Sequence, residues 1–214
     1  MPRSRQAPTQ QPPDEATDHS AFPRRTVTTR RRWYRNHTLR ADASDGGAWW
    51  FSSSVGRFDL PAPDGTCYLA SAPEAAAMEL VGPSHTANGW VPADLLEGCV
   101  VSLLRLPTSV RAADCADERA REWRVSNELT STSAYAVTQA WARVFRRDGF
   151  GGVLAALRFS PGDARGLAVF GEAGAPSPAW SGDDSPIAVV EIVGNMGVRV
   201  VEPPGLADVE VVRP

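Results

Sequence analysis

Apolar segments in this 214-residue chain are short, and in its second half glycine and proline interrupt them. Short apolar runs bounded by such residues are typical of buried strands. We predict strands at residues 26–36, 66–70, 99–104, 152–159, 166–170, 187–193 and 198–201. Gly194-Asn195, between the last two, suits a hairpin turn. A chain with this many short strands needs a sheet at its core.

The predicted helices are grouped in the middle of the chain. Ser71 and Glu74 form an S-x-x-E capping box with Pro73 between them, so a helix should run over residues 73–80 and end near Gly82. A charged, exposed helix is predicted at residues 112–123. The strongest helical pattern covers residues 133–147, and Gly149 is placed to end it. Grouped helices in a strand-rich chain favour an α+β fold with a mixed or antiparallel sheet over a doubly wound parallel one.

The N-terminal residues differ in composition from the rest. Residues 1–26 are rich in proline, glutamine, arginine and aspartate, and this predicts a disordered leader before a single domain at 27–214. Seven of the 22 arginines lie in the first 32 residues, so the remainder carries a net charge of about −7. A folded body this acidic is a poor binder of nucleic acid.

Several classes of protein lack their signatures here. The chain has no apolar run long enough to span a membrane and no apolar stretch of a secretion signal near Met1, so a cytoplasmic location is expected. Cys67, Cys99 and Cys115 are odd in number and show no paired spacing, which predicts neither disulfides nor a metal site. Phosphate-binding, dinucleotide-binding, zinc-protease and serine-hydrolase motifs are absent.

What remains is an ordered set of motifs. WYR stands at 33–35, GRFD at 56–59 and GTCYLASAPEAAAMEL at 65–80, followed by AYAVTQAWARVFRRDGFGGVLAALRFS and RGLAVFGEAG downstream. Together, over residues 31–174, they resemble the RES domain, the fold of bacterial toxins paired with Xre-type antitoxins. The resemblance implies a fold similar to ADP-ribosyltransferases, with residues 27–214 as the RES domain.

The resemblance also implies an activity. A RES-type enzyme would cleave the nicotinamide–ribose bond of NAD+ as a phosphorylase or a glycohydrolase, with inorganic phosphate or water as acceptor and no cofactor. An Xre-like antitoxin and a homodimer are the partners it implies.

The chemistry of three charged residues fits that activity. Guanidinium groups bind phosphate oxygens through paired hydrogen bonds, so Arg35 and Arg57 are candidates for the pyrophosphate of NAD+. Departure of nicotinamide builds positive charge on the ribose, and Glu79 on the predicted helix is the candidate to stabilise it. This hypothesis requires that the three side chains converge on one cavity.

The remaining site candidates are polar or aromatic. Tyr34 and Tyr68 would stack on nicotinamide or bind a ribose hydroxyl. The resemblance implies a substrate-binding role for Gln139, on the matched helix, and for the family serine. Ser133, or less favourably Ser131, must supply this serine because Ala136 stands at the position counted back from Gln139.

Two other functions stay open from the sequence. One is the transfer of ADP-ribose to a protein or nucleic acid, and the other is an inactive, partner-binding RES domain. Each candidate also has a structural alternative: Arg35 in a surface ion pair, Glu79 as a solvated helix residue, Tyr68 in the core. Trp49, Trp50 and Phe51 would either line a pocket or pack beneath the loop that holds them.

Overall fold

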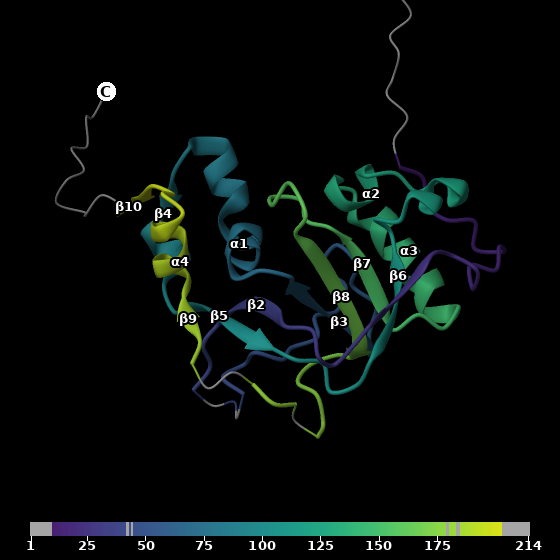
Figure 1. Cartoon of the computed structure of the whole chain (residues 1–214), viewed down its shortest axis with the longest axis horizontal. Helices are drawn as coiled ribbons and strands as arrows, with labels where there is room; N and C mark the ends of the chain where they lie inside the picture. Colours follow the sequence, from purple (N-terminus) through teal and green to yellow (C-terminus); the bar gives the residue numbers. More distant parts are fainter. Residues whose placement is uncertain (1–9, 42, 44, 179, 183–184, 203–214) are drawn as a thin grey trace, which may run out of the picture.

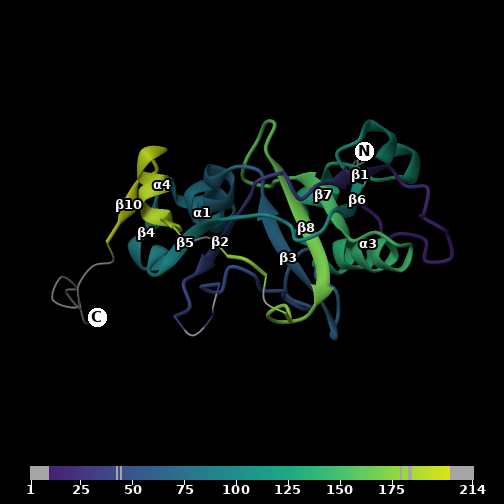
Figure 2. The ribbon, with the colours of Figure 1, turned by 60° about the horizontal axis from the view of Figure 1, so that its bottom comes forward.

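A computed structural model describes residues 10–41, 43, 45–178, 180–182 and 185–202. Its largest feature is an eight-stranded sheet in the order β1-β6-β7-β8-β3-β2-β5-β9 (Figures 1 and 2). In that order the strands are Arg24–Val27, Val110–Asp114, Gly152–Ala156, Arg165–Glu172, Asp64–Ala70, Trp33–Thr38, Cys99–Leu104 and Ile187–Ala188. All neighbours in this sheet are antiparallel except β6 and β7, which are parallel. The predicted α+β fold with a mixed sheet is confirmed.

Helices gather at the two ends of the sheet (Figure 1). The first group is α1 (Pro73–Asn88) and α4 (Val189–Asn195), beside the 3-10 turn η1 (Ala93–Leu96). The second group is α2 (Glu128–Ser131) and α3 (Tyr135–Arg147), with the 3-10 turn η2 (Glu118–Trp123). A small parallel pair, β4 (Val91–Pro92) with β10 (Val200–Val201), lies next to the first group. None of the described helices has the length and apolar character needed to cross a membrane.

Both helix groups pack on the same face of the sheet. Alternate residues of a strand point to opposite faces, so Tyr68 and Ala70 of β3 share one face. Tyr68 packs against the cluster that contains Trp141 and Phe145 of α3, whereas Ala70 packs against the cluster that contains Ala76 of α1. The sheet surface between the two groups is therefore left without a covering helix.

Loops cover the opposite face. Cys67 and Leu69 point to that side and pack with Trp49, Phe51 and Leu167. Trp49 and Phe51 are almost completely buried, while Trp50 between them is 41% exposed. Of the two interpretations of this aromatic run, packing beneath the loop is the correct one.

Several predicted elements are confirmed and others are wrong. The strands at 66–70, 99–104 and 166–170 are present, and the 133–147 helix forms from Tyr135. The strand predicted at 152–159 is present but ends at Ala156. The segment predicted as one strand at 26–36 forms two strands separated by a turn. Of the helix predicted at 112–123, residues 112–114 belong to strand β6, since the alanines there fill the interior of the sheet, and residues 118–123 form the 3-10 turn η2. Residues 189–195 are helix α4, so Gly194-Asn195 ends a helix and is not a hairpin turn.

Helix α1 begins at Pro73 as predicted but continues six residues beyond Gly82. The capping box does not form: Ala72 is the N-cap, and the Ser71 hydroxyl instead accepts a hydrogen bond from the Arg165 amide. Gly82 lies inside the helix, where Phe159 packs directly against it. Glycine is needed at this position because a Cβ would lie 2.2 Å from the Phe159 ring. Tertiary packing thus overrides the weak local helix propensity of Gly82 and Pro83. Gly89, with φ of 73°, ends the helix.

The predicted disorder of residues 10–26 is also wrong; residues 1–9 of that leader lie outside the described residues. Phe22 is 1% exposed and belongs to the core beside α3. The Gln10 amide donates to Glu128, and the Trp141 indole donates to the Gln11 carbonyl at 3.0 Å. Composition predicted disorder because the segment is too polar to form a core of its own. It is ordered because its few apolar side chains are buried against α3 and η2.

Candidate active site

The uncovered part of the helical face forms a cavity of about 690 Å³, which we call the central cavity. Its floor is the sheet at Tyr68, Ala155 and Ala168. Its walls are α1, the 56–58 loop, the 157–159 loop and the start of α3. The lining residues that carry charged or polar groups are Asn36, Arg57, Tyr68, Glu79, Thr86, Thr130, Tyr135 and Arg158.

The loop that precedes β3 is organised by one buried carboxylate. Asp59 is 1% exposed and accepts hydrogen bonds from the Ser52 hydroxyl, the amides of Val55 and Gly56, and the Tyr68 hydroxyl at 2.7 Å. Tyr68 in turn accepts from the Phe58 amide at 2.8 Å. Burial and Asp59 raise the pKa of the Tyr68 hydroxyl, which therefore stays protonated. Tyr68 lines the cavity with its ring, while its hydroxyl holds the loop.

Gly56 is the position in this loop where the backbone comes closest to its neighbours. A Cβ there would lie 2.6 Å from Asp59 Oδ1 and 2.6 Å from the Tyr68 hydroxyl oxygen. The glycine of the GRFD motif is thus explained by steric exclusion.

Helix α3 fixes the same loop from the other side. The Gln139 amide donates to the Gly56 carbonyl at 2.9 Å, and the buried Thr138 hydroxyl donates to the Arg57 carbonyl. Gln139 does not line the central cavity. The contacts in the structure place it behind the loop, where it supports Arg57.

Arg57 projects from this loop into the cavity. Its guanidinium donates to the Thr132 carbonyl and lies over the Tyr135 ring, 5.1 Å from the ring centroid. Burial lowers its pKa, an effect that Tyr135 and Glu79 oppose and Arg158 reinforces. The group remains a cation, because arginine titrates far above neutral pH.

Glu79 reaches the cavity from α1. Its carboxylate accepts a hydrogen bond from the Phe159 amide at 2.9 Å. Burial raises its pKa, whereas the Phe159 amide, Arg57 and Arg158 act to lower it. No ion pair joins Glu79 to either guanidinium among the described residues, so its carboxylate faces cations without being neutralised by contact.

Arg35 does not reach the central cavity. Its neighbour Asn36 lines the cavity, and strand alternation turns Arg35 to the other face of the sheet. There its guanidinium donates to the carbonyls of Gly47 and Ala48. The expected convergence of three charged residues is therefore wrong for Arg35 and correct for Arg57 and Glu79.

Two other candidates lie close to the cavity without lining it. Tyr34 packs in the cluster beneath α1, and Ser133 is exposed in the link between α2 and α3. Their proposed contacts with substrate remain predictions.

Residues that the sequence did not single out contribute to the site. Asp59 was visible in the GRFD motif but had no assigned role. Asn36 donates from its side chain to the Ala76 carbonyl and so joins β2 to α1 at the cavity wall. Arg158 and Phe159 are the second and third residues after β7, where only their position near a strand end could have indicated a site.

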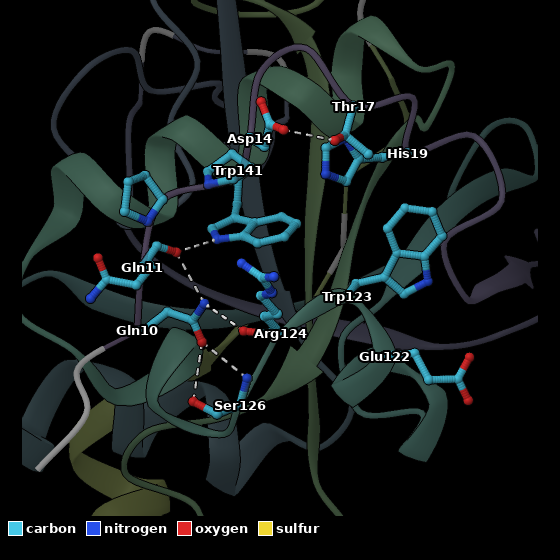
Figure 3. Close-up of a pocket in the computed structure, with 12 residues that line it drawn as sticks. Gln10, Gln11, Asp14, Thr17, His19, Glu122, Trp123, Arg124, Ser126 and Trp141 are labelled. Atoms are coloured by element: carbon cyan, nitrogen blue, oxygen red, sulfur yellow. Dashed lines mark hydrogen bonds between the residues drawn. The ribbon is translucent and has the colours of Figure 1, made fainter.

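A second cavity of about 610 Å³ lies under residues 10–19, and we call it the N-terminal cavity (Figure 3). Trp123 and Trp141 form its aromatic wall with His19. The Gln10 side chain is tied to the Arg124 carbonyl and to Ser126. None of the predicted site residues lines it.

Metal ligands are not gathered in the described part of the chain. No group of three or more histidine, cysteine or acidic side chains there could hold a metal ion. The three cysteines are free, and two of them are buried.

This chain is similar to known proteins in both sequence and fold. The family model of the RES domain matches residues 23–187, so the chain belongs to the RES domain family. A chain of the M. tuberculosis MbcT–MbcA toxin–antitoxin complex has a similar fold, with a TM-score of 0.52 and 21% identity over 68% of this chain and 76% of that one. No curated protein matches the chain.

Proposed function

We propose that this RES-domain protein is a toxin that degrades NAD+ by cleaving the nicotinamide–ribose bond. The observation that carries the proposal is the placement of Glu79 and Arg57 on two walls of one cavity of about 690 Å³. This volume is within the range of small-molecule and cofactor sites, roughly 300–1,000 Å³. Family membership supports the assignment, and the fold shared with a chain of a toxin–antitoxin complex supports the toxin role.

The chemistry assigned to Glu79 follows from its surroundings. Cleavage breaks the bond from the ribose C1″ to the nicotinamide nitrogen, and nicotinamide leaves with the electron pair as a neutral molecule. The ribose gains positive charge in the transition state, and a carboxylate held in a low-dielectric cavity stabilises it more than water can. The Phe159 amide holds the Glu79 carboxylate at the cavity wall through one of its oxygens.

The acceptor completes the reaction. Attack by a phosphate oxygen on C1″ gives ADP-ribose 1″-phosphate, and attack by water gives ADP-ribose and a proton. Arg57 supplies a cation for the substrate pyrophosphate, and Tyr135 offers an exposed ring beside it. Tyr34 and Ser133 are proposed as secondary contacts of the bound dinucleotide.

The proposal includes a partner. An Xre-like antitoxin would neutralise the protein by closing access to the central cavity, and a homodimer is the proposed assembly. The proposed location is the cytoplasm, where NAD+ is available.

The direct test is to incubate the purified chain with NAD+ with and without inorganic phosphate and to identify the products. Formation of ADP-ribose 1″-phosphate only with phosphate identifies a phosphorylase, and ADP-ribose under both conditions identifies a glycohydrolase. NAD+ labelled in its adenine half distinguishes transfer, because label on a protein or nucleic acid identifies an ADP-ribosyltransferase. Unchanged NAD+ in every condition would contradict the proposal and leave a partner-binding RES domain.

A further inference from the structure

Arg57 balances only part of the negative charge of the proposed substrate. The pyrophosphate of a dinucleotide carries two negative charges, and the guanidinium expected to share this task, that of Arg35, lies on the other face of the sheet. A second cation in the cavity wall would balance the remaining charge.

Arg158 stands in that wall. It is the second residue after β7 and lines the central cavity with Arg57 and Glu79. The amide of the next residue, Phe159, is bonded to the Glu79 carboxylate at 2.9 Å, so the backbone at Arg158 is fixed beside the catalytic candidate. The charge of Arg158 acts to lower the pKa of both Arg57 and Glu79, as expected for a cation that lines the same cavity.

The side chain of Arg158 is also uncommitted. In the described part of the chain its guanidinium forms no ion pair and no side-chain hydrogen bond. It lies over the Phe159 ring, 5.1 Å from the ring centroid. Other arginines are engaged: Arg25 binds Asp114, Arg146 binds Asp64 and Arg147 binds Asp148. An exposed guanidinium next to a second cation, without a carboxylate in contact, is arranged to receive an anion.

We propose that Arg158 and Arg57 together bind the pyrophosphate of the substrate, from two loops on either side of Glu79. This inference rests on the proposed function in so far as it identifies the anion as that of a dinucleotide. It assigns Arg158 the role first expected of Arg35. With the pyrophosphate held between the two guanidiniums, the attached ribose is directed to Glu79.

Binding of ADP, adenosine and inorganic pyrophosphate to the full chain tests this assignment, because none of the three carries the bond to be cleaved. Arg158→Ala should weaken ADP and pyrophosphate binding by about tenfold or more, in line with the loss of a charge-assisted hydrogen bond. Adenosine binding should not change. Arg158→Lys should restore part of the affinity, because lysine keeps the charge but not the paired donors.

Arg165→Ala is the matched control. Arg165 lies on the next strand, does not line the cavity, and donates to the carbonyls of Gly162 and Ala164. The Arg165→Ala substitution also removes one positive charge, but outside the cavity, and should leave ADP binding unchanged. Equal losses in the two variants would overturn the proposal, as would an unchanged ADP affinity in Arg158→Ala or no ADP binding by the unmodified chain.

The activity assay separates this inference from the proposed function. If the chain cleaves NAD+, Arg158→Ala should raise KM for NAD+ about tenfold or more and change kcat far less. An unchanged KM would refute the role of Arg158 and leave NAD+ degradation intact. Conversely, Arg158-dependent ADP binding without NAD+ cleavage would refute the enzyme and preserve the pyrophosphate site.

Discussion

The central cavity and the N-terminal cavity have similar volumes but opposite electrostatic arrangements. In the N-terminal cavity, the polar groups are mostly bonded to other parts of the chain: Gln10 to Ser126, and the Thr17 hydroxyl to Asp14. Asp148, which does not line this cavity, bonds to the His19 amide and to Arg147. In the central cavity, Glu79 faces two guanidiniums without an ion pair.

This difference separates a cavity that results from packing from one suited to a ligand. Volume does not distinguish them, since one is about 610 Å³ and the other about 690 Å³. Charges held apart in a partly buried cavity cost stability and are usually found where they have a function. We therefore expect substitutions in the central cavity to affect catalysis and those at the N-terminal cavity to affect folding.

Glu79→Gln should produce the largest effect. We expect kcat for NAD+ cleavage to fall by about 100- to 1,000-fold, comparable to the loss of other groups that stabilise transition-state charge. Glutamine can still accept from the Phe159 amide, so the melting temperature should not fall. Glu74→Gln, in the exposed first turn of the same helix, is the control. Activity within a few-fold of the unmodified protein would remove Glu79 from the mechanism.

Gly56→Ala should damage both folding and activity. The added methyl group has no space between Asp59 and Tyr68, so the loop must move, at a cost of about 2 kcal/mol in the free energy of unfolding. Urea denaturation measures the cost, and NAD+ turnover measures the displacement of Arg57. In Gly194→Ala, where a Cβ meets nothing within 4 Å, stability should be kept or raised. Equal behaviour of the two variants would contradict the steric role of Gly56.

Asp148→Ala should affect folding alone. Loss of its bonds to Arg147 and to the His19 amide should lower the free energy of unfolding by about 1.5 kcal/mol and leave kcat/KM unchanged below the melting temperature. Glu118→Ala, at an exposed acid of η2, should be neutral. A change in kcat/KM would mean that the packing of the N-terminal segment affects the structure of the central cavity.

The same carboxylate has a pH signature. Its bond to Arg147 lowers the pKa of Asp148 from 3.8 to about 2 in the folded chain. Its contribution to stability is thus complete above pH 3.8 and is lost as the pH falls toward 2. In Asp148→Ala, the free energy of unfolding measured between pH 2 and 3.8 should fall less with decreasing pH than it does in the unmodified protein.

The smallest expected effect is a shift in the acidic limb of activity. Glu79 must be ionised to stabilise the ribose, and burial raises its pKa above 4.5, so kcat/KM should fall with decreasing pH at a midpoint above that value. Arg158 opposes the rise, and Arg158→Ala should therefore move the midpoint further up. A midpoint that stays in place would mean that the charge of Arg158 does not act on Glu79.

Local patterns predicted the centre of this fold better than its ends. The YLA strand and the PEAAAMEL helix are adjacent in sequence and in space, so the positions of Tyr68 and Glu79 followed from short-range signals. Helix α4 was read as a strand because Val189, Ile192 and Val193 are β-branched, and only packing against α1 selects the helix.

The site itself was only partly predictable. Glu79 and Arg57 were identified, but the face to which Arg35 points depends on the register of β2 against β3 and β5, which the sequence does not state. Arg158 lies about 80 residues from Glu79 in the sequence, and the loop after β7 brings the two together through the bond between the Phe159 amide and the Glu79 carboxylate. Such contacts depend on tertiary structure, and no spacing rule reveals them.

The network around Asp59 has a kinetic consequence. Its bonds to Ser52, Val55, Gly56 and Tyr68 fix the loop that carries Arg57 before any ligand arrives. Little conformational entropy is then lost from this loop on association, because its backbone is already in place. Ligand capture at this wall of the cavity should accordingly follow simple one-step kinetics, with a rate that rises in proportion to ligand concentration.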